Sequence, residues 1–211
     1  MPPIADSILT LVLLTNFFIL GTSYLRSAIR GVALQGLLLG ILPLFVESDA
    51  TLRLVALVTA TTLVKAVVIP GLLLKALRDV HIRHEVEPYL GFVPTLFLCA
   101  IGTALALLFA DMLPLAREDR IGLFVPASLA TLFSGFLCLT TRRKALTQVT
   151  GYLVLENGIY IFSLLLYQSM IVEVGILLDL LVGIFVMGIV INHIQREFSS
   201  IDTERLSHLR E

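Results

Sequence analysis

The sequence predicts an all-α protein, a polytopic membrane helix bundle with about seven transmembrane helices. Of its 211 residues, 57% are hydrophobic and only 15% are charged. The apolar residues fall in blocks of about 20, the length at which a helix crosses the hydrocarbon core of a bilayer. Breaking the chain at charged and turn-forming clusters gives candidate helices over residues 7–25, 31–46, 52–77, 89–110, 121–141, 146–168 and 172–194. We therefore expect a multi-pass protein of the cell (inner or plasma) membrane.

The connections between these blocks are short and differ in charge. A connection such as residues 47–49 leaves no room for an extramembrane domain, so residues 1–211 are predicted to form a single membrane domain. Alternate connections and the tail share most of the basic residues: Arg26, Arg30, Lys75, Arg78, Arg83, Arg142, Arg143, Lys144, Arg196, Arg205 and Arg210. By the positive-inside rule, this bias predicts an N-terminus outside and a C-terminus in the cytoplasm.

The third candidate helix carries a lysine, Lys65, near its middle. Pro70 follows and cannot donate a backbone hydrogen bond to the carbonyl of Ala66, so we expect a kink and a polar pocket beside the lysine. The alternative is a lysine whose ammonium group snorkels toward a membrane interface.

The fourth candidate helix is predicted to link two three-span parts. Gln35-Gly36-Leu37 and Thr150-Gly151-Tyr152 each open a span after a basic connection, and the same offset, to within one residue, relates Lys65 to Asp179. This weak repeat divides the chain into residues 1–88, a linking span and loop over 89–120, and residues 121–211.

The sixth candidate helix has a polar stripe with a carboxylate at its centre. The stripe consists of Gln148, Tyr152, Glu156, Tyr160, Ser163 and Tyr167, whose spacing of three or four places them on one helix face. A charged side chain at the bilayer centre costs roughly 2.5–3.5 kcal/mol on insertion scales and usually faces a polar path. We expect Tyr152, Glu156 and Tyr160, together with Lys65, to belong to a proton pathway. The alternative is tyrosines that pack between helices around one satisfied glutamate.

The seventh candidate helix carries a second carboxylate, Asp179, with Gly175 and Gly183 one turn to either side. Small residues there let water or a neighbouring backbone approach, so we expect Asp179 to belong to the same pathway. His193 ends the span and is predicted to take protons at the cytoplasmic mouth, or else to cap the helix. A permanent bridge between Asp179 and Lys65 is the structural alternative.

No catalytic, cofactor-binding or metal-binding motif is expected in this chain. Cys99 and Cys138 stand apart from any Cys/His spacing that would build a disulfide framework or an iron–sulfur site. His81 and His84 have acidic neighbours, but a solvated loop is favoured over a metal site there. Nothing in the composition points to nucleic acid as a partner.

Residues 130–211 resemble the K subunit of bacterial respiratory complex I. In that family a basic loop precedes a span of pattern Gly-Leu-Glu-x-x-x-Asn, and here Arg142 and Arg143 precede the segment from Gly151 to Asn157. The glycine and asparagine match, while the family's glutamate position holds Leu153 and Glu156 lies one turn later. Asp179 with Gly183 matches the glutamate and glycine of the family's third span, and residues 200–204 resemble its end.

With about seven spans and this C-terminal part, the chain is similar to the hydrogenase-4 component E family of membrane-bound nickel-iron hydrogenase and formate hydrogenlyase-type complexes. The resemblance implies a non-catalytic subunit that contributes to proton translocation through buried carboxylates. It would lie between antiporter-like membrane subunits and the hydrogenase membrane anchor subunit. The nickel-iron centre and iron–sulfur clusters would belong to peripheral partner subunits. A stand-alone ion-coupled transporter and a purely structural scaffold are the alternatives, and protons or sodium are both open as the translocated ion.

Overall fold

The computed structural model describes residues 3–46, 52–79, 88–112, 122–165 and 188. Within these ranges the chain is helical apart from turns and contains no strand, which confirms the all-α prediction. The N-terminal helices are α1 (Pro3–Gly21), α2 (Leu25–Ile41), the short α3 (Pro43–Val46), α4 (Leu52–Leu63), η1 (Val64–Val68) and α5 (Ile69–Asp79). The later helices are α6 (Phe92–Met112), α7 (Phe124–Thr141) and α8 (Ala145–Leu165).

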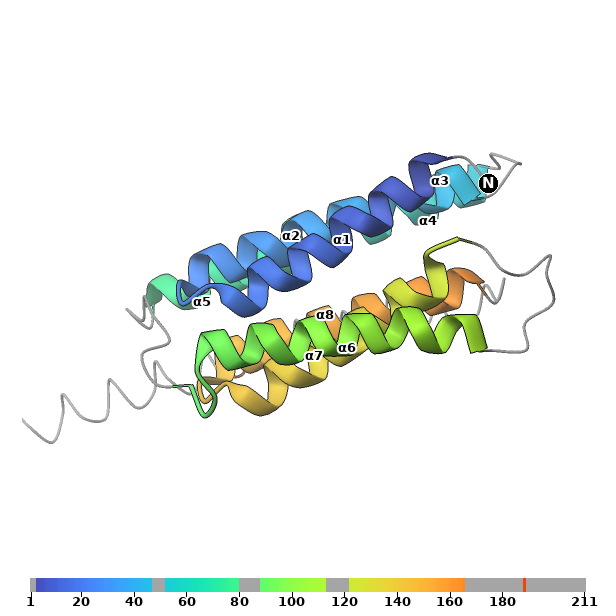
Figure 1. The fold of residues 1–211 in the computed structure, drawn as a ribbon. Helices are drawn as coiled ribbons and strands as arrows, with labels where there is room; N and C mark the ends of the chain where they lie inside the picture. The colour runs from blue at the N-terminus through green and yellow to red at the C-terminus, as the bar shows by residue number, and fades with distance from the viewer. Residues whose placement is uncertain (1–2, 47–51, 80–87, 113–121, 166–187, 189–211) are drawn as a thin grey trace, which may run out of the picture.

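The helices form a bundle of two layers with roughly aligned axes. Figure 1 shows the helices of residues 3–79 on one side, in blue to teal, and α6, α7 and α8 on the other. The layers meet where α1 packs against α6 and α7 and where α2 packs against α8. Residues that the sequence separates by more than half of the chain are thereby brought side by side.

Five segments of the described chain are long and apolar enough to cross a membrane. They are Ile4–Gly21, Leu25–Phe45, Val58–Arg78, Phe92–Ala110 and Phe124–Thr141. The 21-residue helix α8 packs in the same bundle and is less apolar, because it carries Gln148, Glu156 and Asn157. The first six predicted spans therefore correspond to observed helices, and the seventh lies outside the described residues.

The second span begins at Leu25, earlier than residue 31, where the sequence predicted it to begin. Arg26 and Arg30 consequently lie in the first turns of α2 and are exposed, while Ala28 and Ile29 are buried on the opposite side. A helix tolerates such arginines near its end because their long apolar stems follow the helix surface while the guanidinium groups reach the interface.

Glycines allow α7 and α8 to pack closely. An added Cβ at Gly151 would lie 2.9 Å from Cβ of Cys138, and one at Gly158 would lie 2.6 Å from the backbone nitrogen of Leu132. Small residues at such crossings let helix backbones approach, which is the usual source of packing energy between membrane helices. The close approach holds α8, and therefore Glu156, at a fixed position in the bundle.

Arg142, which the sequence placed in a basic connection, is buried in the turn between α7 and α8. Only 1% of the residue is exposed, and its guanidinium group donates to the carbonyl of Leu20 at the end of α1. The same group lies over the ring of Phe92, 4.4 Å from the ring centroid, at the start of α6. This arginine therefore joins the ends of α1, α6 and α7 at one end of the bundle.

Candidate functional site

Lys65 lies in a π-helical turn in the middle of the third span. The turn η1 joins α4 to α5, and the backbone N–H of Ile69 donates to the carbonyl of Val64. Pro70 follows directly and has no N–H, so the regular α-helical hydrogen-bond pattern cannot pass through this point. The sequence predicted a kink here, and the structure has a π-bulge over Val64–Val68, directly before Ile69 and Pro70; such bulges are a common cause of helix bending.

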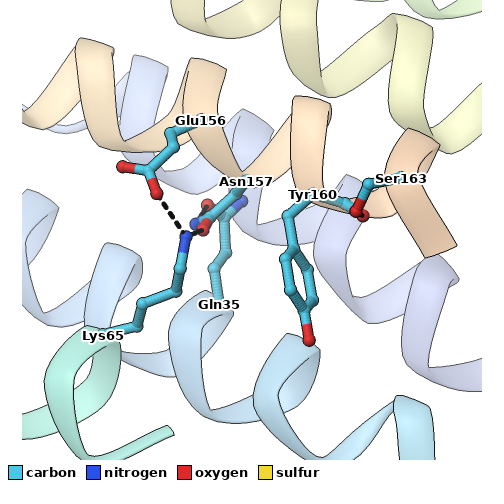
Figure 2. A network of polar contacts seen from close by, with 6 residues as sticks. All are labelled: Gln35, Lys65, Glu156, Asn157, Tyr160 and Ser163. Atoms are coloured by element: carbon cyan, nitrogen blue, oxygen red, sulfur yellow. Dashed lines mark hydrogen bonds and ion pairs between the residues drawn. The ribbon is translucent and has the colours of Figure 1, made fainter. Parts of the chain in front are cut away.

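Lys65 forms a buried ion pair with Glu156 of α8. Its Nζ atom donates to Oε1 of Glu156 at 2.7 Å, and the two side chains are 5% and 3% exposed. The other carboxylate oxygen, Oε2, has no hydrogen-bond partner among the described residues. Figure 2 shows Oε2 directed away from Lys65. The lysine thus neutralises the carboxylate through one oxygen, and the second oxygen is left as an acceptor.

A chain of amide side chains runs from the ion pair across the bundle. Lys65 Nζ contacts Oδ1 of Asn157 at 3.5 Å, and Nδ2 of Asn157 donates to Oε1 of Gln35 at 3.3 Å. Nε2 of Gln35 donates to Oδ1 of Asn16 at 2.7 Å, and Nδ2 of Asn16 donates to Oγ1 of Thr131 at 2.9 Å. Each of these residues is at least nine-tenths buried. The network thus connects η1, α8, α2, α1 and α7.

The remaining surroundings of the lysine combine a ring, a glycine and a small cavity. The ammonium nitrogen lies 5.3 Å from the centroid of the Tyr160 ring, within the range of a cation–π contact. An added Cβ at Gly36 would lie 2.8 Å from the carbonyl oxygen of Lys65, so the glycine is needed for the approach of α2 to η1. A cavity of about 10 Å³ is lined by Val32, Gly36, Lys65, Leu153 and Asn157. That is room for about one water molecule.

The predicted polar stripe of α8 divides into parts with different contacts. Glu156 and Tyr160 lie beside Lys65, as Figure 2 shows. Tyr152 is partly buried and packs against an apolar cluster formed by α1, α2, α5 and α8. Gln148 donates to the carbonyl of Arg142 at 3.0 Å, and Ser163 donates to the carbonyl of Tyr160 at 2.7 Å. Asp179, His193 and Tyr167 lie outside the described residues.

Sequence reasoning missed Asn16, Gln35 and Thr131 as members of the site. Asn16 is a polar residue within the first apolar block, and Gln35 served only to mark the weak repeat. A usable signal existed, because a buried amide in a membrane helix needs hydrogen-bond partners and tends to find them on neighbouring helices. Asn16 and Thr131 are 115 positions apart, the offset that also separates Gly36 from Gly151.

The site holds two ionisable groups, the Lys65 ammonium and the Glu156 carboxylate, inside an apolar helix bundle. A lysine and a carboxylate can each gain or lose a proton, and the cost of changing the charge is high where water is scarce. Within the described ranges there is no group of three or more His, Cys, Asp or Glu side chains that could hold a metal ion. The site therefore offers charge and hydrogen bonding, with apolar helices around it.

The helices and the buried ion pair define a polytopic helical membrane protein with an ionisable centre. The chain is 32% identical over 193 residues to an uncharacterized protein of Mycobacterium tuberculosis. The aligned region covers 89% of this chain and 87% of that protein. It is 23% identical over 216 residues to hydrogenase-4 component E of Escherichia coli strain K12, covering 98% of this chain and 97% of the relative. The Shigella flexneri protein of the same name matches equally well.

This full-length similarity places the chain in the hydrogenase-4 component E family. No family model matches the sequence, and no solved structure matches the fold.

Proposed function

We propose that this chain is a non-catalytic integral membrane subunit of a membrane-bound hydrogenase assembly, and that Glu156 and Lys65 take part in its proton translocation. Membership in such an assembly is supported by the relatives named as a hydrogenase-4 component, which align over nearly the whole chain. Proton translocation is supported by the buried ion pair. Both charges lie deep in a bundle of membrane-spanning length, where a merely structural polar contact could be made more cheaply by neutral groups.

The single observation that carries the proton proposal is the incomplete pairing of Glu156. One carboxylate oxygen accepts from Lys65, while Oε2 is buried and has no partner among the described residues. An anionic oxygen in apolar surroundings is unfavourable unless it is solvated, paired or protonated. Oε2 is therefore the atom at which a proton would be received.

We propose the partner subunits of the assembly from the family resemblance. Partners would be antiporter-like membrane subunits, the hydrogenase membrane anchor subunit, and peripheral nickel-iron hydrogenase and iron–sulfur subunits. The nickel-iron centre and the iron–sulfur clusters would be held by those partners, and the location would be the cell (inner or plasma) membrane. Asp179, His193, Tyr152 and Tyr160 are proposed as further members of the proton pathway.

The test is a Glu156→Gln substitution in the assembled complex. The amide oxygen still accepts a hydrogen bond from Lys65, so the subunit should assemble, while the titratable proton is lost. In reconstituted vesicles we expect proton translocation to fall at least about tenfold, and hydrogenase activity with a soluble electron acceptor to persist. Thr150→Val is the matched control, because Thr150 is equally buried on α8 and donates only within its own helix, to the carbonyl of Leu146.

Three outcomes separate the proposal from its alternatives. Unchanged proton translocation in Glu156→Gln would make Glu156 structural and favour the scaffold. A chain that does not co-purify with hydrogenase subunits, and that transports ions when reconstituted alone, would favour a stand-alone ion-coupled transporter. Loss of translocation with intact assembly, and no change in the Thr150→Val control, would support the proposal.

A further inference from the structure

The amide chain from Lys65 to Thr131 has a fixed direction. A lysine ammonium group has donors only, so the oxygen of Asn157 and not its NH₂ group must face Lys65. The NH₂ group of Asn157 then faces Gln35, whose oxygen accepts it. In the same way, the NH₂ group of Gln35 donates to the oxygen of Asn16, and the NH₂ group of Asn16 donates to the hydroxyl oxygen of Thr131.

A second anchor enforces the same direction from inside the chain. Nε2 of Gln35 also donates to the backbone carbonyl of Val12 at 3.3 Å. A backbone carbonyl can only accept, so Gln35 is held with its oxygen toward Asn157. Every amide carbonyl therefore lies on the lysine side of its own NH₂ group. Hydrogen bonds aligned in this way polarise one another and present negative ends of dipoles to the ammonium group.

The two members of the ion pair differ in how their charged forms are supported. Lys65 as a cation has the Glu156 carboxylate, the Asn157 oxygen and the face of the Tyr160 ring. Glu156 as an anion has the ammonium group on one oxygen and no partner for the other among the described residues. If Lys65 lost its charge, the negative ends of the aligned amide dipoles would have no cation to stabilise, and their favourable interaction with the ammonium group would be lost. Protonation of Glu156 leaves that chain intact.

We infer that Asn157, Gln35, Asn16 and Thr131 are positioning residues that keep Lys65 charged, so that Glu156 is the member of the pair that takes up and releases the proton. The inference deepens the proposed function and rests on it. A proton from the aqueous phase would bind Oε2 of Glu156, changing the net charge of the pair from zero to one positive charge, and its release would restore the neutral total. Among the described residues, Lys65 and the phenol of Tyr160 are the other titratable groups beside Glu156, and the proposed cycle moves no proton to or from either of them.

Infrared spectroscopy of the complex in lipid tests this inference through the carbonyl stretch of a protonated carboxyl group. The band of Glu156 is identified by its loss in Glu156→Gln. At neutral pH the resting wild type should show little of it, because both members of the pair are charged. In Gln35→Met the aligned amides are interrupted, so transfer of the lysine proton to Glu156 becomes easier, and the fraction of protonated Glu156 should rise by about three- to tenfold.

The size of the effect should depend on distance along the chain. Asn16→Leu should raise the band less than Gln35→Met, and Thr131→Val least, because each removes a link further from Lys65. Thr150→Val should leave the band unchanged. A purely structural role would not produce this order, since all of these residues are fully buried.

Two results would overturn the inference. A folded Gln35→Met complex with the wild-type band would show that the amides do not hold the lysine charge. Equal bands in Gln35→Met, Asn16→Leu and Thr150→Val would show a general effect of removing buried polar groups. Either result can occur while Glu156→Gln abolishes proton translocation, so failure of the inference can be distinguished from failure of the proposed function.

Discussion

The ammonium nitrogen of Lys65 lies 2.7 Å from Oε1 of Glu156, although the two residues are 91 positions apart in the chain. Lys65 belongs to the layer of residues 3–79 and Glu156 to the opposite layer, so their bond crosses between the layers (Figure 1). Formation of the pair therefore requires that α8 be packed against the N-terminal helices. A measurement of the ion pair therefore tests whether the two layers have packed together as well as how the site is charged.

Removal of either charge alone should destabilise the subunit. Lys65→Met leaves a buried carboxylate and Glu156→Leu leaves a buried ammonium group, each at a cost of about 3–5 kcal/mol. The double variant removes both charges and should recover most of the lost stability, giving a large coupling energy. Equilibrium unfolding in mixed micelles, or the fraction of subunit found in the complex, would measure it. Additive effects of the two substitutions would contradict a direct pair.

The glycine beside Lys65 supplies a sharper test of packing. An added Cβ at Gly36 would meet the carbonyl of Lys65 at 2.8 Å, so Gly36→Ala should push η1 away from α2 and cost about 1–3 kcal/mol. Gly71→Ala is the matched control, because Gly71 lies in α5 with no atom within 4 Å of the added Cβ. That control should be neutral or stabilising by up to about 1 kcal/mol.

The same Gly36→Ala variant should also weaken proton translocation, since it displaces the backbone that carries Lys65. Thermal unfolding and translocation would be measured on the same preparations. If Gly36→Ala and Gly71→Ala behaved alike in both assays, the close contact between α2 and η1 would not matter for the site.

The helices were largely predictable because membrane spans are recognised by length and apolar composition. The apolar block at residues 121–141 corresponds to α7, and Pro70 predicted the irregularity that η1 contains. The form of that irregularity was not predictable, because a proline removes one backbone donor and does not specify whether the helix kinks or forms a π-bulge. The partner of Lys65 was not predictable either. The sequence pointed to Asp179 as a possible partner, and the pairing with Glu156 depends on the register between helices far apart in the chain.

The amide chain shows a second limit of sequence reasoning. A single asparagine or glutamine in an apolar block has no charge that would mark it as functional. Gln35 becomes informative only when Asn16 and Asn157 are seen on either side of it. The network forms only where η1, α8, α2, α1 and α7 meet, and no single helix carries its pattern.

A contact between the first helix and the start of α7 gives an independent prediction about stability. Oδ1 of Asp6 accepts from the backbone N–H of Leu123 at 3.1 Å, and Gly122 before it has a φ of 47°. The carboxylate thus satisfies a free N–H at a helix N-terminus, where negative charge is favoured. Asp6→Ala should cost about 1 kcal/mol, and Asp6→Asn, which keeps an acceptor, should cost less. Thermal unfolding would show this order, and equal loss in both variants would argue against capping.

Asp179, the second carboxylate of the proposed pathway, lies outside the described residues. Lys65 forms an ion pair with Glu156. In the sequence, Gly175 and Gly183 leave room for water beside Asp179, which favours a titrating carboxylate there over a permanent bridge. We therefore expect Asp179→Asn to assemble normally and to lose coupled proton translocation. Lys65→Met should not rescue the loss, and the coupling energy between these two substitutions should stay below about 0.5 kcal/mol, the range of independent sites. The measurements are complex assembly and proton translocation for both single variants and the double, with the Lys65 and Glu156 cycle as the reference for a true pair. Assembly lost in the Lys65 and Asp179 single variants and restored in their double variant would instead show a fixed bridge, and Asp179 would then be removed from the proposed pathway.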